Sequence, residues 1–168
     1  LSLMLGVMNP KDKLEGAGGN PDQPSKVQAV INFSGPTDLP TWRIAPEAEP
    51  QFERDLGRDS DGVLEDLLGT DDRTSALMAQ ASPITYVDAG DPPILTFHGD
   101  SDLIVAADQA RRFHEALDKA GVTNKLFIVE NAGHGLNPEQ VMDATAKALA
   151  FLKEVFEEPE QVSSDNAE

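Results

Sequence analysis

Two short polar motifs, each directly after an apolar segment, constrain the fold of this chain more than any other feature. Residues 98–105 (HGDSDLIV) follow the apolar run 93–98, and residues 131–135 (NAGHG) follow the run 125–129. Between them, residues 107–120 place apolar side chains at helical spacing. This order of strand, helix and strand is typical of a parallel sheet with helical crossovers, so we predict an α/β fold.

The same patterns predict further elements on both sides of the motifs. A strand is expected over 27–33 and a last amphipathic helix over 138–156. The nearly continuous apolar stretch 1–8 is interpreted as the end of a buried helix, and the glycine- and proline-rich stretch 16–24 as a loop.

Residues 36–70 interrupt this alternation. They are irregular in pattern and rich in proline and acidic residues, so we expect an excursion over the surface, a lid or an insertion, with a short helix near 63–68. A further helix, capped by Asp71 and Asp72, is expected to run to Gln80.

Length and composition predict one folded unit. A chain of 168 residues with 39% apolar residues can bury a core, and we expect residues 1–156 to share one domain. The acidic stretch 157–168 is expected to be a disordered tail. Because Leu1 is not a methionine, we expect the N-terminus of the protein to lie upstream, and the sequence leaves the cellular compartment open.

Composition also excludes several functions. A net charge of −17 repels a phosphate backbone, so nucleic acid is not an expected partner. No apolar run is long enough to span a membrane. The absence of cysteine excludes disulfides, thiolate metal sites and a cysteine nucleophile within these residues.

The two motifs supply an acid and a base. Parallel strands joined by a crossover release their following loops at the same edge of the sheet, so Asp102 and His134 are expected to meet there. The carboxylate would bind one ring nitrogen and leave the other free to accept a hydroxyl proton. Gly133 and Gly135 are interpreted as allowing a sharp turn beside the ring and leaving room for a substrate. This arrangement predicts two members of a Ser-His-Asp triad.

Other residues compete for these roles. Asp100 is the alternative acid, but we expect it to bind nearby backbone amides instead. Taken singly, Asp102 has the properties of a turn residue and His134 those of a surface histidine. His98 is interpreted as a buried structural histidine and His114 as part of a solvated helix face.

The third member of a triad, the nucleophile, is missing. No serine lies in a Gly-x-Ser-x-Gly turn. Ser34 follows a strand, but Asn32 and Pro36 occupy the positions where a nucleophile elbow needs small residues, so Ser34 is interpreted as a turn residue. The chain is therefore interpreted as the C-terminal part of a serine hydrolase.

A calcium loop is the alternative for residues 59–62 (DSDG). Leu68 stands where such a loop needs its bidentate glutamate, so a solvated acidic turn is expected.

The motifs of this chain and their order resemble those of the α/β-hydrolase fold. Within it, the similarity is to the esterase and lipase group of acetyl esterases, hormone-sensitive-lipase-like carboxylesterases and bacterial feruloyl-esterase-like enzymes. The resemblance rests on residues 27–38, 81–87 (ASPITYV), 98–102 (HGDSD) and 133–135 (GHG), and spans most of 27–156.

This resemblance implies that the chain is the C-terminal part of an α/β-hydrolase fold, with Asp102 as triad acid and His134 as base. The nucleophile serine would then lie a few residues before Leu1, and the oxyanion hole would also come from residues outside the chain. The chain alone would be inactive. Its partners would be a small-molecule ester and the missing N-terminal half of the same fold, and no metal or organic cofactor is implied.

The leading hypothesis is a serine-dependent carboxylic ester hydrolase. One alternative is a prolyl-oligopeptidase-like serine peptidase, which places its acid and base in similar loops. The other is a non-catalytic half-fold that serves binding or assembly, although a sheet cut beside its central strands would expose an unpaired edge. The sequence does not identify the acyl or alcohol group.

Overall fold

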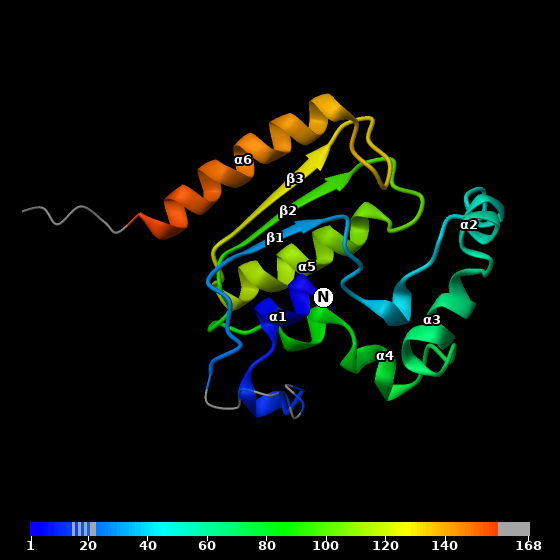
Figure 1. The fold of residues 1–168 in the computed structure, drawn as a ribbon, viewed down its shortest axis with the longest axis horizontal. Helices are drawn as coiled ribbons and strands as arrows, with labels where there is room; N and C mark the ends of the chain where they lie inside the picture. Colours follow the sequence, from blue (N-terminus) through cyan, green and yellow to red (C-terminus); the bar gives the residue numbers. More distant parts are fainter. Residues whose placement is uncertain (15, 17, 19, 21–22, 158–168) are drawn as a thin grey trace, which may run out of the picture.

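Three parallel strands form the centre of the structure, a computed structural model that describes residues 1–14, 16, 18, 20 and 23–157 (Figure 1). The strands lie side by side in the order β1 (Val30–Phe33), β2 (Ile94–Gly99) and β3 (Asn124–Val129). Part of the expected 16–24 loop, and the expected tail apart from Glu157, lie outside the described residues.

Helices cover both faces of this sheet. In Figure 1, α6 (Pro138–Phe156) lies on one face, and α5 (Ala107–Ala120) and α1 (Ser2–Val7) lie on the other. Helix α5 carries the chain from β2 to β3, and β2 pairs with both neighbouring strands in parallel. The predicted α/β fold, a parallel sheet with helical crossovers, is confirmed.

The central strand divides the core into two layers. Ile94 packs with Val7 of α1 and Phe113 of α5, whereas the next residue, Leu95, packs with Phe151 of α6. Successive side chains of a strand point to opposite faces, so a strand covered on both sides is apolar throughout. All six residues of β2 are buried.

Strand β1 is shorter than the expected 27–33. Val30 is level with Ile94 of β2, which places Ala29 beside Pro93. The carbonyl of Pro93 accepts a hydrogen bond from the N–H of Val30 at 3.0 Å, but proline has no backbone N–H to donate in return, so the ladder does not extend before this pair.

Both long helices have the predicted bounds. Gly121 ends α5 in a left-handed conformation with φ of 75°, which glycine adopts without strain. Asn137 begins α6 by accepting a hydrogen bond from the N–H of Gln140, whose side chain in turn binds the N–H of Asn137. Val141 of α6 is exposed, because the contact with the sheet is centred on Ala144 and Phe151.

His114 does not lie on a solvated face as expected. It is buried on α5, where its Nδ1 lies 2.6 Å from Oδ1 of Asn124, the first residue of β3. The helix packs against the start of this strand, a contact that the charged neighbours of His114 along the chain do not indicate.

The excursion folds into helices at the carboxyl ends of the strands (Figure 1). They are α2 (Glu49–Leu56) and α3 (Ser60–Leu68), and α4 (Ala76–Gln80) follows the excursion. They share a separate apolar cluster that includes Trp42, Leu64 and Met78. Helix α2 was not predicted, because it buries none of its residues completely and therefore has no clear apolar stripe.

Two helix starts in this region differ from the sequence interpretation. Asp59 caps α3 by accepting a hydrogen bond from the N–H of Gly62 at 2.8 Å, so residues 59–62 begin a helix. Ser75 caps α4 through the N–H of Leu77, while Asp72 binds the N–H of Thr74. The predicted capping role of Asp71 and Asp72 is therefore wrong.

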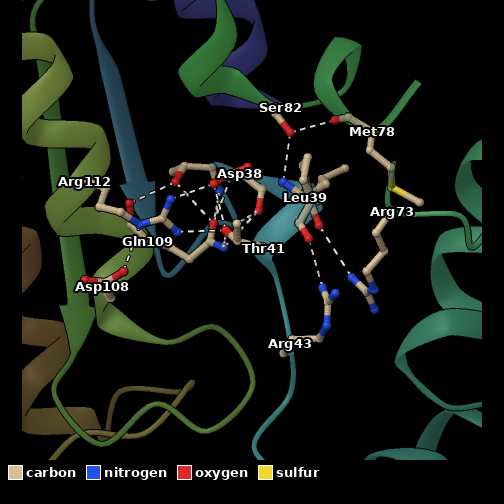
Figure 2. A network of polar contacts seen from close by, with 12 residues as sticks. Asp38, Leu39, Thr41, Arg43, Arg73, Met78, Ser82, Asp108, Gln109 and Arg112 are labelled. Carbon is tan, nitrogen blue, oxygen red and sulfur yellow. Dashed lines mark hydrogen bonds and ion pairs between the residues drawn. The ribbon is translucent and has the colours of Figure 1, made fainter. Parts of the chain in front are cut away.

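A polar network fastens the start of the excursion to α5. Figure 2 shows Gln109 and Arg112 directed at Asp38 and Thr41. The buried Gln109 side chain accepts hydrogen bonds from the N–H groups of Thr37 (2.9 Å) and Asp38 (2.8 Å) and donates to the carbonyl of Asp38 (2.9 Å). Arg112 binds the Asp38 carboxylate at 2.6 Å. The excursion is thus fixed relative to the sheet edge.

Candidate active site

The loops that follow β2 and β3 are joined along their backbones. The N–H of Asp100 donates to the carbonyl of Val129 at 3.1 Å, and that of Ser101 donates to the carbonyl of Ala132 at 3.0 Å. A Cβ on Gly99 would lie 2.3 Å from the carbonyl oxygens of both Ala132 and Gly133, so only glycine permits this approach. The contact fixes the loop that carries His134 against the loop that carries Asp102.

The sharp turn before His134 is made by Asn131, with φ of 55°. Asparagine is among the residues that most readily adopt this left-handed conformation. Gly133 and Gly135 have no positive φ, and a Cβ on either would contact nothing within 4 Å. The expectation that these glycines allow the turn is wrong, although both leave open space beside the ring.

Asp102 is the most completely bound carboxylate of the site. Its side chain is fully buried, and Oδ1 accepts hydrogen bonds from the N–H groups of Ile104 and Val105, both at 2.9 Å. Oδ2 lies 3.0 Å from Nδ1 of His134 and 3.3 Å from Nε2 of His98. Four donors therefore surround one carboxylate.

These donors keep Asp102 ionised. Burial raises the pKa of its carboxyl group, but hydrogen bonds from His134, His98 and the N–H groups of Val105 and Ile104 lower it more, so the pKa falls well below its usual value. The charge is then available to stabilise a protonated imidazole.

His134 combines contact with the buried carboxylate and access to solvent. Its side chain is 47% exposed. The hydrogen bond to Asp102 raises the pKa of the imidazole, burial opposes the shift, and the charge of Asp102 adds to it. In the neutral ring Nδ1 donates to Asp102, which leaves Nε2 as the proton acceptor. Among the described residues, none forms a hydrogen bond with Nε2.

His98 contacts the same carboxylate from inside the fold. Its ring is fully buried, so the prediction of a buried histidine is confirmed. Nε2 lies 2.7 Å from the carbonyl oxygen of Val105, which can only accept, so Nε2 carries a proton that Asp102 shares. Nδ1 is buried and has no partner among the described residues. The contact with Asp102 was not predicted.

Asp100 does not bind the backbone amides as expected. Asp100 is exposed and accepts a hydrogen bond from the hydroxyl of Ser101 at 2.9 Å. The backbone amides that we expected Asp100 to bind are bound by Asp102 instead. Asp102 contacts His134, as expected.

Ser34 lies in a strained turn despite its unfavourable neighbours. It is buried and has φ of 49°, the left-handed region that a nucleophile elbow also uses. It lines the same pocket as His134, but within the described part of the chain no hydrogen bond joins the two side chains. The geometry therefore gives His134 no contact through which to activate the Ser34 hydroxyl.

The pocket beside His134 has a volume of about 400 Å³. Its walls come from the end of β1, from the excursion and from the loop that carries Asp102. No local sequence pattern indicates this pocket, because its walls are contributed by segments that meet only in the fold.

Clusters of metal-ligating side chains and membrane-spanning helices were both sought among the described residues. Across residues 1–14, 16, 18, 20 and 23–157, no group of three or more His, Cys, Asp or Glu side chains could hold a metal ion. None of the helices in these residues is long and apolar enough to cross a membrane.

Comparison with known families gives one match. The family model described as BD-FAE matches residues 1–117, well over half of the chain. The chain belongs to the BD-FAE family. The matched region includes Asp102 and ends before His134.

Curated relatives of this BD-FAE chain are esterases of Mycobacterium tuberculosis. Esterase LipC is 32% identical over 103 residues, which are 57% of this chain and 25% of that protein. The probable carboxylic ester hydrolase LipM is 26% identical over 138 residues, which are 79% of this chain and 30% of that protein. The chain therefore spans less than a third of either relative.

Similar solved structures are also esterases. A propionate-bound thermophilic esterase from Thermogutta terrifontis has a TM-score of 0.65 and 25% identity, with 92% of this chain and 51% of that chain covered. A truncated carbohydrate esterase from gut microbiota has the same TM-score and identity, with 93% and 56% covered. The expected membership in an α/β-hydrolase esterase family is confirmed, and the chain spans about half of these structures.

Proposed function

We propose that the protein containing this chain hydrolyses carboxylic esters through a serine acyl-enzyme, with His134 as the base and Asp102 as the acid that orients it. One observation carries the proposal. A buried, ionised carboxylate lies 3.0 Å from a half-exposed imidazole, at the carboxyl ends of parallel strands in a chain of the BD-FAE family.

In this mechanism His134 accepts a proton and then donates it, once in each half of the reaction. Nε2 accepts the serine hydroxyl proton as the serine oxygen attacks the ester carbonyl, and then gives it to the departing alcohol oxygen as the bond from carbon to that oxygen breaks. A water molecule repeats the sequence on the acyl-enzyme and releases the acid. Asp102 stabilises the imidazolium in both halves, because its buried charge lies in direct contact with the ring.

The nucleophile is proposed to lie N-terminal to Leu1. The 168 residues contain no Gly-x-Ser-x-Gly sequence, and the chain spans about half of the similar esterase structures. In the described part of the chain no strand pairs with the outer edge of β1, and Phe33 at its end is half exposed. An N-terminal half that adds a strand at this edge would complete the sheet.

Residues 1–156 are accordingly proposed to be the C-terminal part of one α/β-hydrolase domain, with 36–70 as its lid or insertion. Ester hydrolysis is favoured over peptidase chemistry because LipC, LipM and the similar structures are all named esterases or ester hydrolases.

The test uses the full-length protein and p-nitrophenyl acetate. We expect turnover in the wild type, and a fall in kcat of about 10⁴-fold or more in the His134→Ala variant. A fluorophosphonate, which labels activated serines covalently, should modify a serine upstream of Leu1, identified by peptide mass spectrometry. Labelling of Ser34, or equal turnover in His134→Ala, would contradict the proposal.

A further inference from the structure

His98 contacts the acid of the site from the interior of the fold. It lies on β2, one residue before the strand ends at Gly99, and its ring is fully buried. Residues 100–105 fold back over the ring, so that Nε2 lies 2.7 Å from the carbonyl oxygen of Val105 and 3.3 Å from Oδ2 of Asp102. One N–H group is therefore shared between two acceptors.

The carbonyl group of Val105 fixes the role of this ring nitrogen. A carbonyl oxygen can only accept a hydrogen bond, so Nε2 is a donor and cannot become an acceptor. The other ring nitrogen, Nδ1, is buried without a partner among the described residues, which is unfavourable. An apolar side chain would fill the same space without an unsatisfied nitrogen. The two contacts of Nε2 are therefore what a histidine contributes at this position.

Oδ2 of Asp102 has two imidazole donors that approach it from different sides. Nδ1 of the half-exposed His134 lies at 3.0 Å, and Nε2 of the buried His98 lies at 3.3 Å. The other oxygen, Oδ1, is occupied by the N–H groups of Ile104 and Val105. A hydrogen bond to an ionised oxygen stabilises its charge, and that oxygen then attracts a second donor less strongly. His98 and His134 thus compete for one oxygen atom.

We propose that His98 is a positioning residue, which limits the attraction of Asp102 for the protonated ring of His134. The inference rests on the proposed function, because it concerns the base of that reaction. Asp102 raises the pKa of the His134 imidazole, and among the described residues it is the charged group that acts on this ring. A base that stays protonated cannot accept the proton of the nucleophile. By binding Oδ2, the N–H of His98 keeps the ring of His134 neutral to lower pH.

Three variants of the full-length protein distinguish this effect from general destabilisation. His98→Phe removes the donor, and His98→Gln retains an N–H group that can reach Oδ2. Thr96→Val is the matched control, because Thr96 is also fully buried on β2 and lies two residues before His98, on the same face of the sheet. Its hydroxyl lies 3.4 Å from the amide nitrogen of Asn32, so this change removes a buried polar contact that does not involve Asp102.

The decisive measurement is the direction in which the titration midpoint of the His134 ring moves, followed by NMR. In His98→Phe we expect a higher midpoint, because Oδ2 then binds His134 alone. For p-nitrophenyl acetate, kcat/KM below the midpoint should then fall by about threefold or more relative to its plateau at high pH. His98→Gln and Thr96→Val should keep the midpoint of the wild type.

A purely structural role of His98 predicts the opposite direction. Loosening of the loop would weaken the contact between Asp102 and His134 and would lower the midpoint. An unchanged or lower midpoint in His98→Phe therefore overturns the inference, and so does an equal rise in His98→Gln or Thr96→Val.

A measurement on the wild type applies even if His98→Phe does not fold. As His134 takes up a proton, it draws more of the charge of Oδ2, so the NMR signal of the Nε2 proton of His98 should shift with the midpoint of His134. A signal that does not respond to this titration would overturn the inference.

The ring titrations need no turnover, so the inference and the proposed function can fail separately. If no ester is hydrolysed but the midpoint rises in His98→Phe alone, the role of His98 stands and the function fails. If esters are hydrolysed and the midpoint does not rise, the function stands and the role of His98 fails.

Discussion

His134 and Asp102 are 32 residues apart in the sequence, yet Nδ1 of the imidazole lies 3.0 Å from Oδ2 of the carboxylate. The two side chains differ sharply in their surroundings, because that of Asp102 is fully buried and that of His134 is 47% exposed. A charge held in a dry environment acts strongly on the one ring nitrogen it contacts, while the opposite side of the ring remains accessible to a reactant.

Replacing Asp102 by asparagine tests the proposed role of its charge. The amide in Asp102→Asn would retain the shape of the side chain but could no longer hold the imidazole in the tautomer that accepts a proton at Nε2, so we expect kcat to fall by about 10⁴-fold. The measurement is steady-state hydrolysis of p-nitrophenyl acetate by the full-length protein. Asp100→Asn, which changes an exposed aspartate two residues away, is the control and should retain activity. Similar losses in both variants would argue against the assignment.

The pH dependence of activity follows from the raised pKa of His134. The neutral ring is the base, and its hydrogen bond to Asp102 keeps it protonated to higher pH than a free histidine, whose pKa is 6.5. We therefore expect kcat/KM to rise with pH through a midpoint above 6.5 and to be lost as pH falls below that midpoint. NMR titration of the His134 ring should give the same midpoint, and a lower one in Asp102→Asn. An unchanged midpoint in that variant would exclude Asp102 as the cause.

The elements that were predicted well are specified by residues within or next to each element. Helix α5 has an apolar stripe and a terminal glycine, and α6 has a capping box and a proline in its first turn, so their bounds required no knowledge of the rest of the fold. Because crossover connections fix which strand ends meet, the approach of Asp102 to His134 followed from β2 and β3 alone.

The features that were missed depend on contacts between distant segments. Helix α2 buries none of its residues completely, and the burial of His114 depends on Asn124. The contact of His98 with Asp102 requires the loop after β2 to fold back over the ring, and no local pattern specifies that path. The close approach at Gly99 is likewise a property of two loops together, so the sequence pointed to Gly133 and Gly135 instead.

Gly99→Ala is expected to separate the two loops. The new methyl group would lie 2.3 Å from two backbone carbonyl oxygens, so the backbone must shift, at a cost of about 1–3 kcal/mol in the free energy of unfolding. A displacement of about 1 Å between acid and base would lower kcat/KM by about 10²-fold. Gly133→Ala is the control for stability, because its methyl group would contact nothing within 4 Å in the folded chain. Urea unfolding and ester hydrolysis measure the two effects, and equal behaviour of the variants would contradict the steric argument.

His98 is expected to matter through the proton on Nε2. In His98→Phe the buried carbonyl of Val105 loses its donor, which should lower the free energy of unfolding by about 1–3 kcal/mol and loosen the loop that holds Asp102. Glutamine can present an N–H at a similar distance from the main chain, so His98→Gln should recover part of both stability and kcat. Urea unfolding and kcat are measured for both variants. If His98→Gln is as impaired as His98→Phe in both, the donor is not the property that matters.

Gln109 connects α5 to the excursion, and its removal should affect the excursion more than the triad. In Gln109→Met the buried N–H groups of Thr37 and Asp38 lose their acceptor, each at a cost of about 1–3 kcal/mol. Because the excursion forms one wall of the pocket beside His134, we expect KM for bulky esters to rise while kcat for p-nitrophenyl acetate changes little. Glu115→Met, on the exposed face of the same helix, is the matched control. Hydrogen exchange should show faster exchange confined to residues 37–69 in Gln109→Met. A uniform increase over the whole fold would mean that Gln109 supports general stability and does not specifically hold the excursion.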